Sequence, residues 1–298
     1  MCKSITLLTD KRYLANQPNN WYVNNIFKDD ELLIDALKSK GFKVFRTNWD
    51  NPTYNWNITD LVLFRTTWDY FERFREFSLW LKRVNTCTTV INPVDLIYWN
   101  LDKKYLLELN AKGVNIASTV LIKKGNSIGL SKLLEKTGFA KAVFKPSISG
   151  AARHTYIITK ANVSQYDALF AELIQNEDFL IQEFQNNIQD KGEVSMMYFG
   201  GKYSHSVLKT AKKGDFRVQD DFGGTVQNYM PDKSEIEFGE YVLAQINSMP
   251  TYARVDIFKD NNTRNALGEL ELIEPELWFR KHPKSAEMLA KTIANQYL

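Results

Sequence analysis

The sequence predicts a mixed α/β and α+β protein, in which an N-terminal α/β domain precedes a small middle lobe and a larger C-terminal lobe. The chain has 298 residues, of which 44% are hydrophobic, enough for one large domain or two to three small ones. Strand and helix patterns alternate in the N-terminal third, which is typical of a parallel α/β layer. Strand-like segments arranged as hairpins dominate the C-terminal third.

The N-terminal elements follow from the spacing of apolar residues. In the stretch NNIFKDDELLIDALKSKGF, Leu33, Ala36 and Leu37 have helical spacing and Gly41 suits the end of the helix. Pro93 ends the last strand, so we expect the first domain boundary near it. Strands are expected at 4–10, 42–49, 60–68 and 88–93, and helices at 24–42 and 71–84.

The rest of the chain is predicted in the same way. Helices are expected at 101–113, 131–138, 165–175 and from Lys284 onward, and strands at 117–125 and 179–186. Residues 140–159 predict a strand, a loop and a second strand, and hairpins are expected at 193–210, about Gly200-Gly201, and at 252–277. The expected domains are therefore residues 1–97, 98–183 and 184–298.

Composition excludes several classes of function. The net charge is +3 with no basic tract, so nothing indicates nucleic-acid binding. No apolar stretch approaches the length of a membrane span or a signal-peptide core. Cys2 and Cys87 match neither a metal-binding spacing nor a disulfide framework, which favours a cytoplasmic protein.

The stretch GELELIEPELWF (268–279) concentrates negative charge in what otherwise reads as a buried strand. Side chains alternate along a strand, so Glu269 and Glu271 share one face while Leu270 and Leu272 share the other. Two carboxylates ~7 Å apart on a half-buried sheet repel each other unless a cation lies between them. The face is therefore either solvated or a site for a divalent cation.

The stretch VFKPSISGAARHTY contains a second charged group. An apolar strand carries Lys145, and the small residues that follow, among them Ser149 and Gly150, allow backbone N–H groups to approach an anion. Arg153 at the far end of the loop can add a guanidinium fork. The alternative is an ordinary Ser/Gly hairpin with a surface lysine.

Two further stretches permit a bland and a functional interpretation. In FLIQEFQNNIQDKGEVS, the residues Gln182, Glu183 and Phe184 can offer backbone hydrogen bonds and an apolar slot to a flat base. Glu193 can accept from ribose hydroxyls. The alternative is a core strand with a charged edge. In VLKTAKKGDFRVQDDFGG, a basic cluster is either a solvated loop or a mobile cover for phosphate or a carboxylate substrate. That cluster is Lys209, Lys212, Lys213 and Arg217.

The order of these pieces is more specific than any one of them. YARVDIF places Asp256 on the strand before Glu269 and Glu271, so three hard oxygen donors suited to Mg²⁺ meet if the strands pair. Along the chain, Lys145 and its loop are followed by QEF, Glu193, the basic loop, Asp256 and the Glu-x-Glu strand. This order resembles the ATP-grasp superfamily, and more closely its branch related to prokaryotic glutathione synthetase that includes cycloserine-forming ligases. The stretches that carry the likeness, from about residue 60 to about residue 280, include VLFRTTWDYF, INPVDLIYWNLDKKYLL, GEVSMMYFGGKYSHSV and GDFRVQDDFGG.

The resemblance implies an ATP-grasp fold whose middle and C-terminal lobes close on ATP and Mg²⁺. It implies that Asp256, Glu269 and Glu271 hold magnesium, although glutathione synthetase usually has Asn at the position of Glu271. It gives Lys209 and Arg217 catalytic roles facing the phosphates or the acyl-phosphate. The ATP-binding residues implied are Lys103, Lys145, Ser149, Gly150, Gln182, Glu183, Phe184, Glu193 and Lys209.

In the N-terminal domain, the stretch RTTWDY places Arg65 and Asp69 near the cleft, and we expect both, with Arg153, to contact substrate. Trp68 and Tyr70 are interpreted as packing residues. Glu274 is either a substrate or outer-shell group or a charged cap beside Pro275.

The reaction implied is ATP-dependent joining of a carboxylate and an amine of a small amino-acid-like substrate, either between molecules or as a cyclisation. The alternatives are a small-molecule kinase of the same fold and a nucleotide-binding module without catalysis. The resemblance also implies a homodimer or homotetramer.

Overall fold

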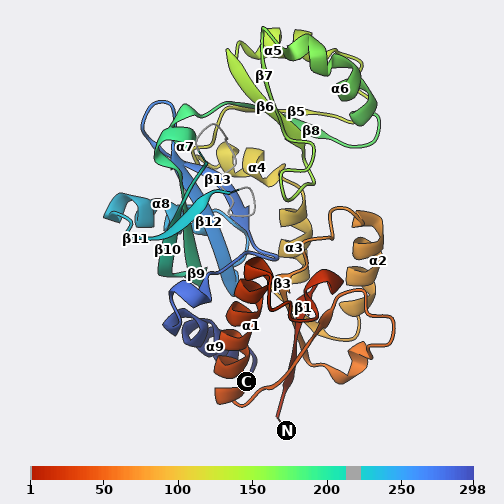
Figure 1. The fold of residues 1–298 in the computed structure, drawn as a ribbon, viewed down its shortest axis with the longest axis vertical. Coiled ribbons are helices and arrows are strands. Elements are labelled where there is room, and N and C mark those ends of the chain that lie inside the picture. Colours follow the sequence, from red (N-terminus) through yellow and green to blue (C-terminus); the bar gives the residue numbers. More distant parts are fainter. Residues whose placement is uncertain (1, 213–222) are drawn as a thin grey trace.

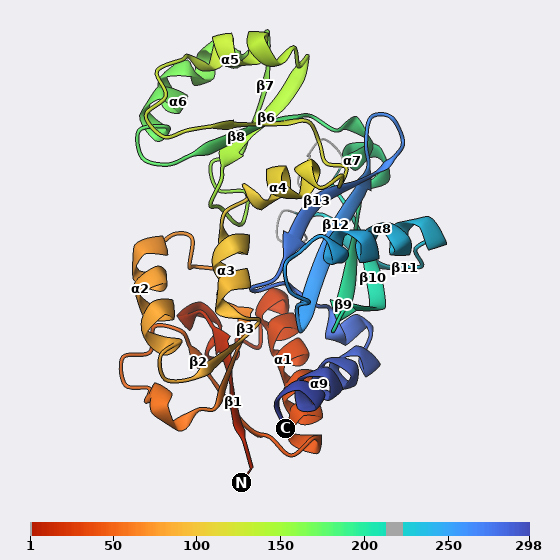
Figure 2. The same ribbon diagram turned by 180° about the vertical axis from the view of Figure 1, so that it is seen from behind.

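The computed structural model describes residues 2–212 and 223–298, which form three sheets with helices packed against them (Figures 1 and 2). In the N-terminal sheet the strand order is β2-β1-β3-β4 and all pairs are parallel, which confirms the predicted α/β layer. Its elements are β1 (Ser4–Thr9), α1 (Trp21–Ser39), β2 (Lys43–Asn48), β3 (Leu61–Thr66), α2 (Phe74–Val84) and β4 (Thr89–Ile91).

Both faces of the N-terminal sheet are buried, as is usual for parallel strands. Leu7 and Leu63 point into a cluster shared with α1, whereas Leu8 and Phe64 point into an aromatic cluster on the opposite face with Trp80 of α2. The continuous apolar runs of β1 and β3 therefore supply two cores at once.

The middle sheet has the strand order β5-β8-β6-β7 with antiparallel pairs, and α5 and α6 lie against it (Figure 1). Phe144 of β6 packs against Phe170 of α6 and Phe179 of β8. The elements are β5 (Thr119–Ile122), α5 (Leu130–Thr137), β6 (Lys141–Pro146), β7 (Tyr156–Thr159), α6 (Asp167–Leu173) and β8 (Phe179–Glu183).

The C-terminal sheet is antiparallel with the order β11-β10-β9-β12-β13. Both predicted hairpins are confirmed, and the first turns through Gly200 and Gly201, whose φ values of 55° and 77° suit glycine. The elements are β9 (Glu193–Phe199), β10 (Lys202–Thr210), β11 (Thr225–Tyr229), α8 (Lys233–Ala244), β12 (Tyr252–Lys259) and β13 (Asn265–Glu271).

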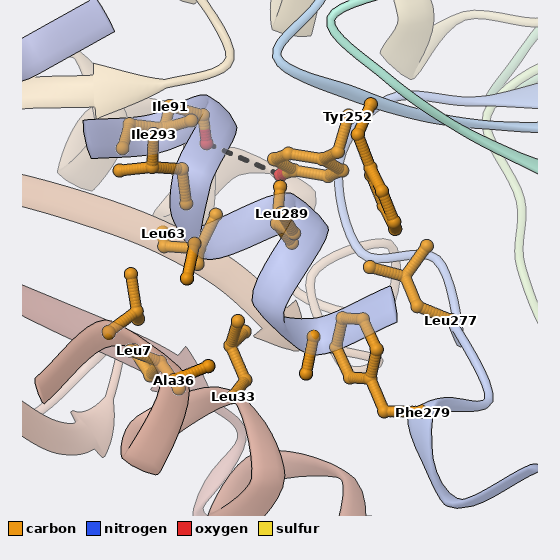
Figure 3. Close-up of a cluster of buried hydrophobic side chains, with 14 of the residues drawn as sticks. Leu7, Leu33, Ala36, Leu63, Ile91, Tyr252, Leu277, Phe279, Leu289 and Ile293 are labelled. Atoms are coloured by element: carbon orange, nitrogen blue, oxygen red, sulfur yellow. Dashed lines mark hydrogen bonds between the residues drawn. The ribbon is translucent and has the colours of Figure 1, made fainter. Parts of the chain in front are cut away.

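The N-terminal domain and the C-terminal sheet share one hydrophobic core. The last helix, α9 (Lys284–Tyr297), lies beside α1, and its Leu289 and Ile293 meet Leu33 and Leu63 in the cluster shown in Figure 3. In that cluster the Tyr252 hydroxyl of β12 donates to the Ile91 carbonyl of β4 over 3.3 Å. The two parts are thus tied together by packing as well as by chain connection.

One predicted helix is wrong in its bounds. The expected helix at 101–113 is instead α3 (Val94–Leu101) followed by α4 (Tyr105–Ala111). Asp102 is extended between them, and the Lys103 N–H donates to the Ser147 carbonyl over 2.8 Å. The break between α3 and α4 therefore leaves Lys103 outside both helices, where its backbone can bond the residue just after β6 in the middle lobe.

Among the described helices and strands, α7 (Asn186–Lys191), β11 and α8, like α3, were not expected. A signal for α8 was present in the sequence, because Asp232 and Glu235 form a reciprocal capping box at its start. None of the described helices combines the length and the apolar character needed to traverse a bilayer. We propose domain boundaries near residues 97 and 183, because the sheets separate there.

Candidate active site

A cavity of about 470 Å³ lies where the three parts of the molecule meet. Its lining draws on β6, the loop after β6, β8, the C-terminal sheet and the N-terminal domain. Most of the residues singled out in the sequence line it, namely Lys103, Lys145, Ser149, Gly150, Gln182, Glu183, Phe184, Glu193, Lys209, Asp256, Glu269 and Glu271.

The acidic side of the cavity follows from strand register. Asp256 of β12 lies opposite Glu269 of β13, and Glu193 of β9 lies opposite Lys209 of β10. Arg254 lies opposite Glu271. Directly opposed residues of antiparallel strands share a face, so the pairing expected of Asp256 and the Glu-x-Glu strand is confirmed.

Cations hold these carboxylates in the structure. The Lys209 ammonium donates to Asp256 over 2.9 Å and also pairs with Glu193, while the Arg254 guanidinium bonds Asp256 over 2.9 Å and pairs with Glu271. Burial acts to raise the pKa of Asp256, but the charges of Arg254 and Lys209 hold that pKa well below its usual range.

Negative charge nevertheless remains in excess. Lys103 pairs with Glu269 over 2.9 Å, and its charge, against burial, holds the pKa of Glu269 below the usual value. Burial, opposed in part by Arg254, raises the pKa of Glu271 to about 7. Burial and the neighbouring Glu271 raise the pKa of Glu274 to about 8. An added cation would stabilise the ionised form of these last two groups.

The expected magnesium residues are brought together only in part. Across residues 2–212 and 223–298, no three His, Cys, Asp or Glu side chains gather as a metal centre, since the acids are paired with lysine and arginine. The hard carboxylate oxygens and the raised pKa of Glu271 still fit a divalent cation. Asp256, Glu269 and Glu271 would hold it once their cation partners turn to another anion.

Lys145 differs from the other lysines of the cavity. It points from β6 into the lining and has no hydrogen bond or ion pair to any described residue, and burial lowers its pKa to about 8. Lys103, by contrast, also donates to the Ser149 carbonyl over 2.7 Å. A partly buried ammonium without a described partner is suited to an anionic ligand.

The small-residue loop after β6 fits closely against its surroundings. A side chain at Gly150 would lie 2.5 Å from the ring of Phe71, so glycine is needed where the loop meets the N-terminal domain. Arg153 forks onto Glu177, with a 2.9 Å bond, and bonds the Ile148 carbonyl. Arg153 therefore anchors the loop and does not line the cavity.

The other end of the cavity is apolar. Val143, Phe184, Ile188, Phe258 and Leu267 line it, which provides a slot for a flat ring. The side-chain amide of Gln182, which also lines the cavity, donates to the Thr119 hydroxyl over 2.9 Å, and the Phe184 N–H donates to the Lys141 carbonyl. These two groups of the expected adenine hinge therefore already have partners within the protein.

A β-bulge at Gly268 shapes the same region. The register between β12 and β13 shifts after Asp256, which leaves Gly268 without a direct partner. A Cβ there would approach Glu193 to 3.2 Å and Phe258 to 3.3 Å. Because Gly268 has no side chain, Glu193 of the acidic part and Phe258 of the apolar part can both lie close to its backbone.

The N-terminal domain contributes residues to the cavity lining that were not predicted from the sequence or were predicted only as packing residues. Arg12, Tyr13 and Tyr22 line the cavity and had no motif to mark them. Trp68 and Tyr70, interpreted as packing residues, also line it. Arg254 lay within the quoted stretch YARVDIF, and its place two residues before Asp256 on one face was a usable signal.

Both substrate residues expected in the N-terminal domain have internal partners. Arg65 is 2% exposed, lies 3.5 Å from Asp30 and donates to the Pro275 carbonyl, and it does not line the cavity. Asp69 accepts from the Trp49 indole over 2.8 Å and from Arg73. Lys209 was expected in a basic loop but lies buried on β10, and Arg217 falls outside the described residues.

Comparisons with known proteins agree with this architecture. Residues 5–92 match the family described as "D-cycloserine synthetase DcsG, N-terminal domain". The chain is 27% identical over 183 residues to the cycloserine biosynthesis protein DcsG of Streptomyces lavendulae. That match covers 60% of this chain and 61% of the relative.

Solved structures extend the similarity to nearly the whole chain. The crystal structure of D-cycloserine synthetase DcsG matches with a TM-score of 0.86 and 24% identity over 98% of this chain and 99% of that one. D-alanine–D-alanine ligase from Bacillus anthracis complexed with ATP matches with a TM-score of 0.63 and 12% identity, over 98% and 96%. ATP-grasp ligase PsnB with a precursor variant, Mg and ADP gives 0.63 and 12%, over 99% of each. The chain therefore has the fold of the ATP-grasp ligases, and its fold is close to that of D-cycloserine synthetase DcsG.

Proposed function

We propose that the protein is an ATP-dependent carboxylate–amine ligase that uses Mg²⁺ and acts on a small amino-acid-like substrate through an acyl-phosphate. The observation that carries the proposal is the meeting of Lys103, Lys145 and Lys209 with the carboxylates of β12 and β13 in one cavity. That cavity opens onto residues of the N-terminal domain, where a second substrate can lie beside the nucleotide. The similarity to DcsG and to other ATP-grasp ligases supports it.

We propose a single orientation for ATP in the cavity. The apolar slot of Val143, Phe184 and Phe258 would take the adenine, and Glu193 would accept from the ribose. The triphosphate then reaches Lys145 and Lys103, whose ammonium groups neutralise it. Bound magnesium, held by Asp256, Glu269 and Glu271, would screen the charge of the phosphates.

The chemistry needs little covalent help from the protein. A carboxylate oxygen of the substrate forms a bond to the γ-phosphorus, the bond from that phosphorus to the β–γ bridging oxygen breaks, and ADP leaves. The amine nitrogen then bonds the acyl carbon, phosphate leaves with the electron pair of the broken C–O bond, and the nitrogen releases a proton. Lys145, Lys209 and Arg254 orient the reactants and stabilise the negative charge on the transferred group.

ADP release tests this proposal against its rivals. A ligase releases ADP only when a carboxylic acid and an amine, or one molecule with both groups, are present with MgATP. ADP release with an alcohol alone would indicate a kinase. Nucleotide binding without turnover on any substrate of the panel would indicate a binding module and would contradict the proposal.

The compartment and assembly belong to the same proposal. Cys2 and Cys87 are both exposed and unpaired, which is compatible with a reducing cytoplasm. A homodimer or homotetramer stays a prediction, and sedimentation measurements at several concentrations would decide it.

A further inference from the structure

The segment after β13 holds Glu274 at the N-terminal-domain side of the cavity. The backbone carbonyls of residues 272–275 all accept hydrogen bonds from side chains of other elements. The Glu274 carbonyl accepts from the Trp68 indole over 2.9 Å, and the Pro275 carbonyl accepts from Arg65. The two preceding carbonyls accept from Asn92 over 2.8 Å and from the Tyr252 hydroxyl over 2.6 Å. A side chain on so rigid a support is preorganised.

Among the described residues, the Glu274 carboxylate has no cation partner of the kind that its neighbours have. Glu269 pairs with Lys103, Glu271 with Arg254 and Glu276 with Arg280. Glu274 lines the same cavity as Tyr70 and has no ion pair with any described residue. Such a carboxylate is stabilised when a ligand brings a positive charge.

Aromatic rings surround this end of the cavity. Tyr13, Tyr22, Trp68 and Tyr70 all line it, and the ring centroids of Tyr13 and Tyr22 lie 5.8 and 6.1 Å from that of Trp68. The faces of aromatic rings attract ammonium groups, most strongly where water is excluded. Arg12, the nearby cation, is already neutralised by Asp10, since the two form an ion pair of 2.6 Å.

We propose that Glu274 is the specificity-determining residue for a substrate that bears a free ammonium group, which it binds between the rings of Trp68 and Tyr70. The inference rests on the proposed ligase function and narrows its substrate class. Arg65 then acts as a positioning residue, because it holds the Pro275 carbonyl beside Glu274.

Ligand binding tests the assignment without turnover. The full-length protein, saturated with ADP and MgCl₂, is titrated with amino acids and with the 2-hydroxy acids that replace the ammonium group by a hydroxyl, such as serine against glyceric acid. We expect an amino acid to bind at least 10-fold more tightly than its hydroxy counterpart. Glu274→Gln should weaken amino-acid binding about 10- to 100-fold and remove that preference, because a charge-assisted hydrogen bond is lost.

Matched variants separate recognition from folding. Glu72→Gln removes an exposed carboxylate from the same end of the cavity and should keep the preference. Glu274→Asp keeps the charge and should keep the preference with weaker binding. Equal affinity of wild type for both members of every pair, no binding by either class, or an unchanged preference in Glu274→Gln would overturn the proposal. Failure of ADP itself to bind would instead contradict the ligase function.

Discussion

The environment of Lys145 does not stabilise its charge in the free protein, whereas an anionic ligand would. Its side chain is partly buried and its ammonium has no described partner, and this burial lowers its pKa to about 8. We therefore expect Lys145→Ala to reduce kcat/KM by a factor of about 100 or more, in line with the loss of one preorganised charge. The melting temperature should stay the same or rise, because a desolvated charge is removed.

The matched control is Lys132→Ala, which removes an exposed lysine of α5. Steady-state ADP release and thermal unfolding of both variants check the expectation. Normal turnover by Lys145→Ala would show that the lysine does not touch the phosphates.

Asp256 differs from Lys145, because its charge stabilises the folded protein even without a ligand. It compensates the buried charges of Lys209 and Arg254, which are 4% and 8% exposed. Asp256→Asn should lower the free energy of unfolding by about 3–5 kcal/mol, since two buried cations each lose one of their two carboxylate partners. Urea unfolding measures this, with the exposed Glu287→Gln of α9 as control, and an unchanged midpoint would refute it.

At the scale of elements, we expect the loop between β6 and β7 to affect nucleotide binding. Arg153 and Glu177 hold it to the middle lobe, with the Nη1–Oε1 bond at 2.9 Å. Arg153→Ala should raise KM for ATP about 3- to 10-fold with a smaller effect on kcat, because the loop loses its anchor.

The partner variant sharpens this prediction. Glu177→Gln breaks the same ion pair and should raise KM to a similar extent, and the double variant should add little, because the two residues act together. Fully additive effects on KM would mean that Arg153 acts elsewhere, for example on substrate.

At the level of elements, the sequence predicted the sheets better than their connections. Apolar runs in β1, β3 and β8 and the Gly200-Gly201 turn depend on local patterns, and the structure confirms them. The break between α3 and α4 was missed because its cause is distant, as the Lys103 N–H bonds Ser147. Long-range hydrogen bonds leave no periodic trace in sequence.

The same distinction applies to the site. Glu269 and Glu271 of β13 could be placed on one face from alternation alone, whereas Asp256 of β12 could be added only on the condition that the two strands pair. Arg65 and Asp69 could not be excluded, because their partners Asp30 and Trp49 lie on other elements. Tyr13 and Tyr22 reach the cavity only through the packing of the N-terminal domain against the other lobes.

At the scale of the whole molecule, His205 is a buried titratable group, away from the cavity, that links stability to pH. His205 of β10 is 3% exposed, bonds the Leu277 carbonyl over 2.9 Å and stacks on His282. Burial lowers its pKa from the usual 6.5 to about 4. The unfolded chain therefore takes up a proton near pH 6.5 while the native protein does not, so this contribution to stability, at most about 3 kcal/mol, is lost as pH falls from about 6.5 to about 4.

Replacement of this histidine tests the linkage. His205→Gln should show a weaker decline of unfolding free energy between pH 6.5 and pH 4.5 than wild type, whereas His154→Gln, in the loop after β6, should follow the wild type. Denaturant unfolding at several pH values measures both. Parallel curves for His205→Gln and wild type would exclude the coupling.

The central claim is that one cavity between the lobes binds MgATP, with the carboxylates of β12 and β13 at the phosphate end. A crystal structure with a non-hydrolysable ATP analogue and MgCl₂ tests it most directly. We predict the γ-phosphate within hydrogen-bonding reach of the Lys145 ammonium, with Asp256 and Glu269 on a magnesium ion and the adenine against Phe184. An analogue bound elsewhere, or bound here with Asp256 and Glu269 still paired only with lysine and arginine and far from any phosphorus, would contradict the account.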